Sequence, residues 1–329
     1  MIEPTAHARA PMEATLPAPI FIFGVTQRSG THFLYDLLLR HPQCRAALSR
    51  TSWEGSWEDH LVEFSGYLSL YAKRVVETNR LNDASTYPLL MRSLGIGIEV
   101  FLRDYDGRPH DPRRPVTKSP VTAYLDVFAE LFPGAPAVLL VRDARAVVAS
   151  ALNTFGGRAD RWILEWRSGA RRFARFQQQH PGAAVVVRYE DLYGDTEQSL
   201  RSLFTRLGLD EDSYDYASIP SMPVRGSSQH GDPNVTWHPK PRTADFTPLR
   251  RAEWLTLEIE RRIAWRVADE METFGYERPA ARYGAAEQMG QRIWSARTRM
   301  GVTIGEWRAK RHSDRIFERL RRSSASHWS

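Results

Sequence analysis

Residues 19–42, PIFIFGVTQRSGTHFLYDLLLRHP, decide the fold of this chain. The apolar run over 19–25 is typical of a strand that is buried on both faces of a parallel sheet. A polar turn follows this run, and apolar residues then recur at helical spacing until Pro42, which ends the helix. A buried strand, a tight turn and a helix in this order are the first unit expected of an α/β fold.

The turn from Gly24 to Thr31 has the chemistry of an anion-binding loop. Backbone N–H groups at the start of a helix have no partner within that helix, and the helix dipole adds partial positive charge there. Gly30 lets the backbone approach a ligand closely. Ser29 and Thr31 offer hydroxyl groups, and Arg28 offers a guanidinium group. The turn is not a Walker A loop, because Gly24 and Gly30 are one residue too far apart and no lysine follows Gly30; the alternative is an ordinary strand–helix turn.

Strands and helices alternate along the rest of the chain. Apolar runs predict further strands at 116–118, 137–141 and 183–189, and Pro, Ser, Gly and Asp residues predict mostly loop over 210–247. Helices are expected over about 58–77, 86–102, 121–131, 161–179, 195–207 and 248–273, with one more directly after the strand at 137–141. The alternation predicts an α/β fold, a P-loop-like parallel sheet flanked by helices with a helical C-terminal extension. The loops after 25, 118, 141 and 189 should then meet at one edge of the sheet.

The composition is that of a folded protein whose positive charge is concentrated at its C-terminal end. The net charge is +6, but from residue 281 onward eleven Lys and Arg stand against four Asp and Glu, so the body gives no argument for nucleic-acid binding. Cys44 is the single cysteine, which excludes an internal disulfide. No apolar run is long enough for a transmembrane helix, and residues 1–17 lack the apolar core of a secretory signal. We expect a flexible leader over 1–17, a catalytic domain over 18–280 and a basic helical tail over 281–329, in a cytoplasmic, bacterial protein.

Two segments carry a resemblance to a known family. QRSGTHFLYDLLLRHP resembles the 5′-phosphosulfate-binding loop of sulfotransferases, in the R-S-G-T form of tyrosylprotein and many bacterial members. Those members usually have a second Thr where this chain has His32. The strand AVLLV followed by Arg142 and, eight residues later, Ser150 resembles the segment that binds the 3′-phosphate in this family. An Arg142–Asp143 ion pair and a surface Ser150 are the alternative for this second segment.

Later segments resemble the family more weakly. Tyr189 begins a stretch similar to the Y-E-x-L segment that closes over the adenine. Residues 224–228 with Lys240 are similar to the late segment that covers the 3′-phosphate and the nucleotide. The resemblance covers about residues 18–275. It implies 3′-phosphoadenosine-5′-phosphosulfate (PAPS) as sulfuryl donor and 3′,5′-adenosine bisphosphate (PAP) as product. The predicted donor-binding residues are Arg28, Ser29, Gly30, Thr31, His32, Arg142, Ser150, Tyr189, Arg225, Ser227, Ser228 and Lys240.

The resemblance also implies the catalytic groups. Sulfuryl transfer is an in-line displacement in which cations stabilise the spreading charge, and no metal is required. Arg28 is one expected cation, and Lys118 is the other because TKSP resembles the family's lysine motif. The acceptor needs a general base. Glu54 is the first candidate, His32 the second, and Glu58 and His60 follow.

Two other functions are alternatives to a sulfotransferase that acts on a hydroxyl or amine. A P-loop kinase or NTPase would need a Walker lysine, which the turn lacks. A catalytically inactive nucleotide-binding protein with the same body is the third hypothesis. The expected acceptor is a small molecule, carbohydrate, lipid or peptide. Apolar residues at helical spacing in the basic tail predict an amphipathic helix suited to peripheral membrane contact or homo-oligomer formation.

Overall fold

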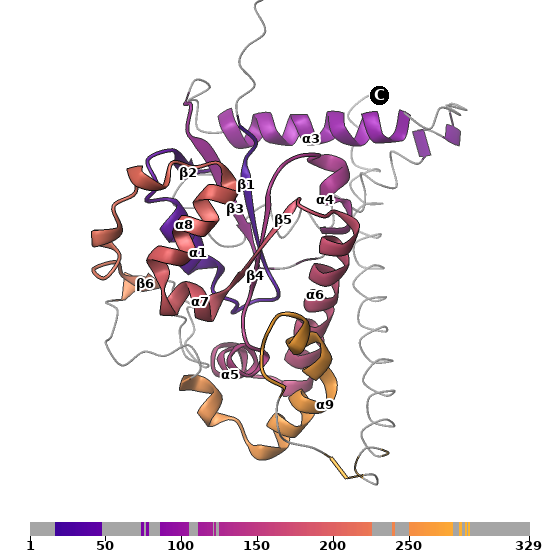
Figure 1. Cartoon of the computed structure of the whole chain (residues 1–329). Helices are drawn as coiled ribbons and strands as arrows, with labels where there is room; N and C mark the ends of the chain where they lie inside the picture. Colours follow the sequence, from indigo (N-terminus) through magenta and orange to yellow (C-terminus); the bar gives the residue numbers. More distant parts are fainter. Residues whose placement is uncertain are drawn as a thin grey trace, which may run out of the picture. The chain divides into compact units, whose positions relative to one another are not determined.

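The computed structural model describes residues 17–47, 74–75, 77–78, 86–104, 111–120, 122, 125–225, 239–240, 250–278, 283–284, 287 and 289. The chain divides into two compact units, Met1–Pro279 and Ala280–Ser329. Every helix and strand labelled in Figure 1 belongs to the first unit. Among the helices that the structure describes, none combines the length and the apolar character that a membrane span requires.

Five parallel strands form one sheet in the order β2-β3-β1-β4-β5 (Figure 1). The α/β fold and the parallel sheet flanked by helices are therefore confirmed. Three of the predicted strands, and the strand of the opening motif, are present with small shifts at their ends. The one strand of this sheet that was not predicted is β2. It has three residues with a charged one in the middle, a pattern too short and too polar to indicate a strand. The strands are β1 (Ile20–Gly24), β2 (Cys44–Ala46), β3 (Arg114–Ser119), β4 (Ala137–Val141) and β5 (Ala184–Arg188).

The central strand β1 is buried on both faces because successive side chains point to opposite sides of the sheet. Ile20 and Ile22 pack on the face covered by α1 (Thr31–Leu38) and α8 (Thr196–Leu207). Phe21 and Phe23 pack on the other face, which is covered by α4 (Leu125–Leu131) and α6 (Ala159–Gln179). Figure 1 shows these two pairs of helices on opposite sides of the strands. The all-apolar sequence of β1 follows from this double burial.

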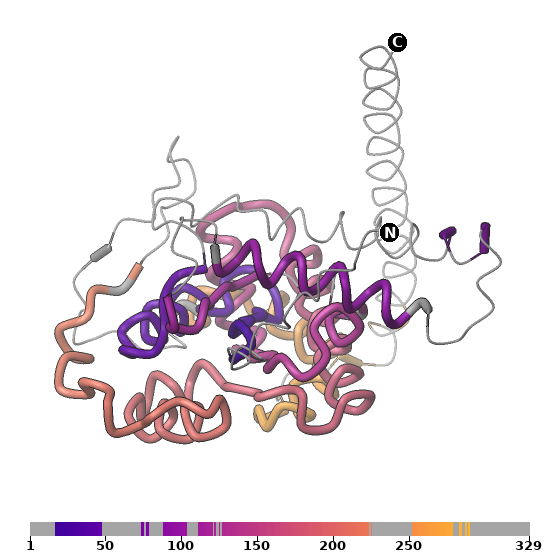
Figure 2. The backbone as a smooth tube through the Cα atoms, turned by 90° about the horizontal axis from the view of Figure 1, so that it is seen from above, coloured from indigo at the N-terminus to yellow at the C-terminus, as the bar shows by residue number. Residues whose placement is uncertain are grey.

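The remaining helices lie mainly at the two ends of the sheet. The helix α3 (Thr86–Asp104) crosses the end opposite to α5 (Ala144–Phe155) and α9 (Leu257–Thr273) (Figures 1 and 2). The short helix α7 (Tyr189–Gly194) follows β5 directly. Since α5 and α7 start where β4 and β5 end, they mark the carboxyl edge of the sheet, where parallel α/β proteins bind their ligands.

The structure corrects several predicted boundaries. The helix expected over 248–273 begins at 257, because the side chain of Thr256 accepts a hydrogen bond from the backbone N–H of Ile259 and caps α9 there. A separate 3₁₀ turn occupies Arg250–Trp254. The strand expected over 183–189 ends at Arg188, because α7 begins at Tyr189. The helix expected over 121–131 begins at Leu125. Most of the helix expected over 58–77 lies outside the described residues.

Candidate active site

The turn between β1 and α1 is held in a defined shape by its own residues. The hydroxyl of Ser29 donates a 2.6 Å hydrogen bond to the carbonyl of Thr26, and it accepts a 3.2 Å bond from the N–H of Thr26. Arg28 and Gly30 both have left-handed backbone angles, with φ of 72° and 95°. Gly30 is the N-cap of α1 and has no side chain with which to cap the first N–H groups of the helix. The turn therefore presents helix N–H groups suited to an anion, while the Ser29 hydroxyl is used inside the turn.

The two segments that were predicted to bind phosphates meet at this turn. The Nε of Arg28 donates a 3.1 Å hydrogen bond to the hydroxyl of Ser150 in α5, although 122 positions separate them. The Nη1 of Arg142 donates a 3.1 Å bond to the backbone carbonyl of Arg28. Arg142 is 7% exposed and Ser150 is 1% exposed. Two guanidinium groups and a buried hydroxyl thus converge at the carboxyl edge of β1 and β4.

Neighbouring residues fix the position of Arg142. The indole Nε1 of Trp166 in α6 donates a 2.9 Å hydrogen bond to the Arg142 carbonyl. Asp143, the next residue, fixes the start of α5. Its carboxylate caps α5 through the N–H of Arg145 and pairs with the Arg145 guanidinium at 2.6 Å. The Trp166 indole and the capped start of α5 therefore hold the backbone at Arg142 in place.

Glu190 is a part of this site that sequence reasoning missed. Its Oε1 accepts a 3.0 Å hydrogen bond from the N–H of Asp143, and its Oε2 accepts a 2.7 Å bond from the hydroxyl of Tyr276. One carboxylate thereby joins the turn after β4, the start of α7 and the residues after α9. The position of Glu190 directly after Tyr189 was a visible signal in the sequence, but the partners of its carboxylate could only be found in the folded chain.

Tyr189 lies against the turn, as part of an aromatic group. Its ring is 4.4 Å from the Arg142 guanidinium, measured from ring centre to Cζ. A Cβ added to Gly30 would come within 2.3 Å of the same ring. The ring centres of Phe33 and Tyr193 lie 6.0 and 6.3 Å from that of Tyr189. Phe33 and Tyr193 were not among the predicted site residues, and with Tyr189 they form a largely buried aromatic group beside Arg142.

A second group of charges surrounds His32 on α1. Burial and the positive charges of Lys118, Arg225 and Arg28 lower the pKa of His32 to about 2. Lys118 itself is 7% exposed near the carboxyl end of β3. Three cations from the turn, from β3 and from β6 (Val224–Arg225) therefore act on one imidazole. Such a cluster of buried positive charge is suited to an anionic ligand.

Asp36 is a second residue that sequence reasoning missed. It follows His32 by one helical turn, and its Oδ2 lies 3.0 Å from the Nε of Arg225. Burial raises the pKa of Asp36 to about 6, although the positive charges of Arg225, Lys118 and Arg40 act in the opposite direction. In the sequence, the spacing of four residues indicates that Asp36 lies on the same face of the helix as His32.

Several predicted site residues lie outside the part of the chain that the structure describes. Glu54, Glu58 and His60, three of the four candidate bases, lie outside the described residues, as do Ser227 and Ser228. The backbone of Lys240 lies in β7 (Pro239–Lys240), which pairs with β6 so that Lys240 stands opposite Val224. Within the described part of the chain, no group of three or more His, Cys, Asp or Glu side chains is placed to hold a metal ion.

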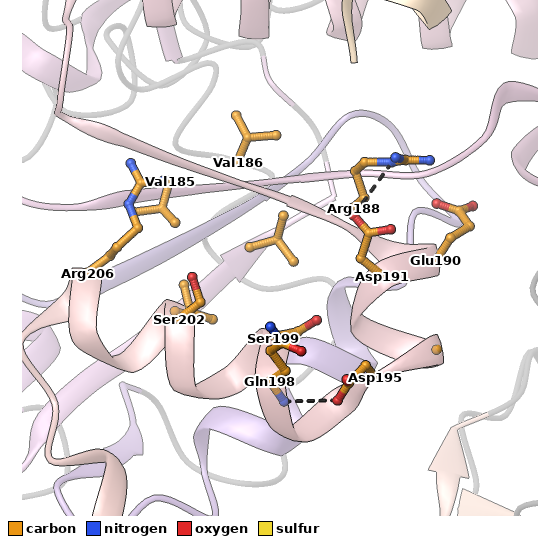
Figure 3. A pocket seen from close by; sticks show the side chains of 13 residues that line it. Val185, Val186, Arg188, Glu190, Asp191, Asp195, Gln198, Ser199, Ser202 and Arg206 are labelled. Carbon is orange, nitrogen blue, oxygen red and sulfur yellow. Dashed lines mark hydrogen bonds and ion pairs between the residues drawn. The ribbon is translucent and has the colours of Figure 1, made fainter. Parts of the chain in front are cut away.

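A pocket of about 560 Å³ lies along β5, α7 and α8 (Figure 3). Arg188 and Arg206 stand at its two ends, with the valines of β5 between them. No predicted donor-binding residue lines this pocket. Because β1 and β4 separate β5 from β3, the pocket is about 14 Å from the strand of Lys118 at the usual strand spacing. Glu190 lines this pocket and also bonds the turn after β4, so the pocket adjoins the candidate site on the side away from Lys118.

A parallel sheet with a strand–turn–helix anion site at its carboxyl edge defines a P-loop-like α/β protein. The model of the sulfotransferase family matches residues 19–213, more than half of the chain, and the protein belongs to this family. A candidate protein-tyrosine sulfotransferase of Caenorhabditis briggsae is 25% identical over 206 residues. That match covers 58% of this chain and 65% of the relative, so the chain spans less than two thirds of the relative's length.

Two solved structures illustrate the similarity within the family. The sulfotransferase domain of the Synechococcus PCC 7002 olefin synthase is 21% identical, with a TM-score of 0.48 over 81% of this chain and 98% of that domain. Sulfotransferase STF9 of Mycobacterium avium is 14% identical, with a TM-score of 0.48 over 81% of this chain and 79% of that protein.

Proposed function

We propose that this sulfotransferase transfers the sulfuryl group of PAPS to a hydroxyl or amine of an acceptor. The observation that carries the proposal is the meeting of Arg28, Arg142 and Ser150 at the start of α1. Two guanidinium groups, a hydroxyl and helix N–H groups are the donors that phosphate oxygens require. The residues present therefore fit a nucleotide that carries phosphates at both its 5′ and 3′ positions.

Each part of the donor has a group of residues suited to hold it. The turn, with Arg28 and Thr31, is assigned to the 5′-phosphosulfate, and Arg142 with Ser150 to the 3′-phosphate. The aromatic group of Tyr189, Phe33 and Tyr193 is assigned to the adenine, because base stacking on aromatic rings is favourable and tolerant in geometry. Lys118 and the turn lie on neighbouring strands, since Lys118 stands beside Ile22 in the register of β3 and β1.

When bound, PAPS supplies an activated sulfuryl group: the acceptor oxygen or nitrogen bonds to sulfur while the bond from sulfur to the bridging oxygen breaks. Lys118 and Arg28 neutralise negative charge that develops on the leaving phosphate and on the sulfuryl oxygens. A general base takes the acceptor proton. His32 is a weak base because burial and three nearby cations lower its pKa, and a bound anion would offset the part due to the cations. Glu54 stays the first candidate for this role.

A thermal-shift measurement with PAP tests the donor class independently of the acceptor. At about 100 times its Kd, a ligand that binds only the folded state stabilises it by about 2.7 kcal/mol. We expect PAP to stabilise the wild type and to have little effect on Arg28→Ala or Arg142→Ala. Arg161→Ala removes an exposed guanidinium paired with Glu165 and is the matched control, which should respond like the wild type.

Other outcomes of this measurement distinguish the alternatives. Stabilisation by ATP with Mg²⁺ but not by PAP would overturn the proposal and favour a kinase or NTPase. Stabilisation by PAP without release of PAP from PAPS would favour an inactive nucleotide-binding protein. Because the curated relative is named for protein tyrosine, a tyrosine-containing peptide is the first acceptor to supply in the turnover assay.

A further inference from the structure

Asp36 is a half-buried carboxylate beside the site that the proposed mechanism does not use. Its side chain is 15% exposed, and that of its partner Arg225 is 20% exposed. The ion pair joins α1 to β6, two elements that pack against each other. Arg225 stands opposite Pro239 in the pairing of β6 with β7, so the same contact anchors both short strands.

This ion pair places a guanidinium in a region that already holds two cations. Asp36 and His32 lie on the same face of α1, because they are four residues apart. The helix α1 packs against β3, the strand of Lys118. His32 accordingly experiences the charges of Lys118, Arg225 and Arg28 together. Mutual repulsion would drive three cations apart, and the negative charge of Asp36 opposes this in the ligand-free protein.

The location of Arg225 differs from the place of the 3′-phosphate residues in the sheet. Arg142 and Ser150 belong to the end of β4 and to α5, whereas Arg225 pairs with α1 on the side of β3. The strand β1 lies between β3 and β4. In the proposed orientation of the donor, the sulfuryl group lies on the β3 side of the site, near Lys118.

We propose that Asp36 is a positioning residue that holds Arg225 beside Lys118 and His32, where Arg225 acts as a third cation facing the sulfuryl group. This inference rests on the proposed function and names a further catalytic group, Arg225, for the same site. A cation that is held in place before the reaction stabilises developing charge without a reorganisation cost. Resemblance alone predicted that Arg225 would cover the 3′-phosphate, and the two assignments make different predictions.

Binding of two nucleotides separates these assignments without any knowledge of the acceptor. PAP has both phosphates but no sulfuryl group, whereas PAPS has all three. We expect Arg225→Gln and Asp36→Asn to raise the Kd of PAPS about tenfold, the size of one charge-assisted hydrogen bond. The Kd of PAP should stay within about twofold of the wild-type value in both variants. Asp36→Glu retains the charge and should recover part of the PAPS affinity.

The matched control is Asp212→Asn, which breaks an Asp–Arg pair of the same kind at an exposed place, where Asp212 is 87% exposed. It should leave both dissociation constants unchanged. Melting temperatures of all variants show whether they fold. If Asp36→Asn does not fold, Arg225→Gln and Asp36→Glu carry the same comparison.

Three results would overturn the inference and leave the proposed function standing. An equal loss of PAP and PAPS affinity in Arg225→Gln would return this residue to the 3′-phosphate. A gain in affinity for both nucleotides in Asp36→Asn would mean that Asp36 acts only through its negative charge. Unchanged PAPS affinity in both variants would mean that the pair has a structural role alone. Wild-type protein that binds neither nucleotide would instead overturn the proposed function, and the inference with it.

Discussion

At Gly30 the backbone takes a left-handed conformation, and the ring of Tyr189 occupies the space where a side chain would be. Glycine populates this region readily, whereas other residues do so at a cost. The contact also brings the backbone of the turn against the aromatic group proposed for adenine. A single missing side chain therefore lets the turn and the aromatic group adjoin.

Gly30→Ala should destabilise the protein by about 1–3 kcal/mol through backbone strain, with a further loss from displacement of the Tyr189 ring. PAP affinity should fall as well, because both the turn and the ring would move. Urea unfolding and calorimetric titration measure the two effects. Gly97→Ala is the control, since a Cβ there meets no atom within 4 Å and α3 should gain about 0.5–1 kcal/mol. A fully stable Gly30→Ala protein with normal PAP binding would contradict this account.

The helices α6 and α9 are joined by a buried group of charges. Asp160 in α6 is 3% exposed and lies 3.0 Å from Arg262 and 3.1 Å from Arg266 in α9. Arg266 is equally enclosed, with 2% of its side chain exposed. The same helix α6 carries Trp166, which binds the carbonyl of Arg142. Contacts between these two helices therefore extend to the proposed donor site.

Asp160→Asn should lower the free energy of unfolding by about 3–5 kcal/mol, because it leaves the buried Arg266 without its carboxylate. Glu165→Gln, at an exposed pair with Arg161 on the same helix, should change stability by no more than about 0.5 kcal/mol. Urea unfolding of the two variants makes the comparison. Equal effects would show that the Asp160 pair is no stronger than a surface contact.

On the scale of the whole molecule, folding is coupled to pH through His32. Its pKa falls from 6.5 in water to about 2 in the folded protein. Below pH 6.5 the unfolded chain binds a proton at His32 that the folded protein does not, so acidification favours unfolding. Each pH unit below 6.5 should cost about 1.4 kcal/mol from this residue. Asp36 acts oppositely, because its raised pKa gives stability below 3.8 that is lost as pH rises through about 6.

Comparison of wild type with His32→Gln isolates the histidine, because Asp36 is present in both. Between about pH 7.5 and about pH 5.5, the wild type should lose about 1.4 kcal/mol more than the variant in urea unfolding. Saturating PAP should reduce this difference, because the bound phosphates offset the cations around His32. The same pH dependence in both proteins would show that His32 is accessible to protons in the folded state.

Much of the fold was predictable because its central strands are buried on both faces. The runs at β1 and β4 are apolar and buried throughout, and the edge strand β5 is apolar as far as Arg188. The helices between these strands have clear apolar periodicity. The unpredicted β2 is an edge strand of three residues. Its extended conformation is stabilised by pairing with β3, and its own short sequence does not indicate a strand. The end of β5 was misplaced by one residue, because Tyr189 suits a strand as well as the helix it begins.

The amino-acid sequence by itself determined the local units: the strand–turn–helix of residues 20–38, the order of strands and helices, and the residue types that suit phosphate. These depend on neighbours within a few positions, where backbone preference and apolar periodicity act. Only the tertiary structure decided that Arg28 meets Ser150, that Glu190 joins Asp143 to Tyr276, and that Asp36 holds Arg225. Each of these contacts joins side chains far apart in the chain, and such partners are set by strand order and helix packing rather than by local pattern.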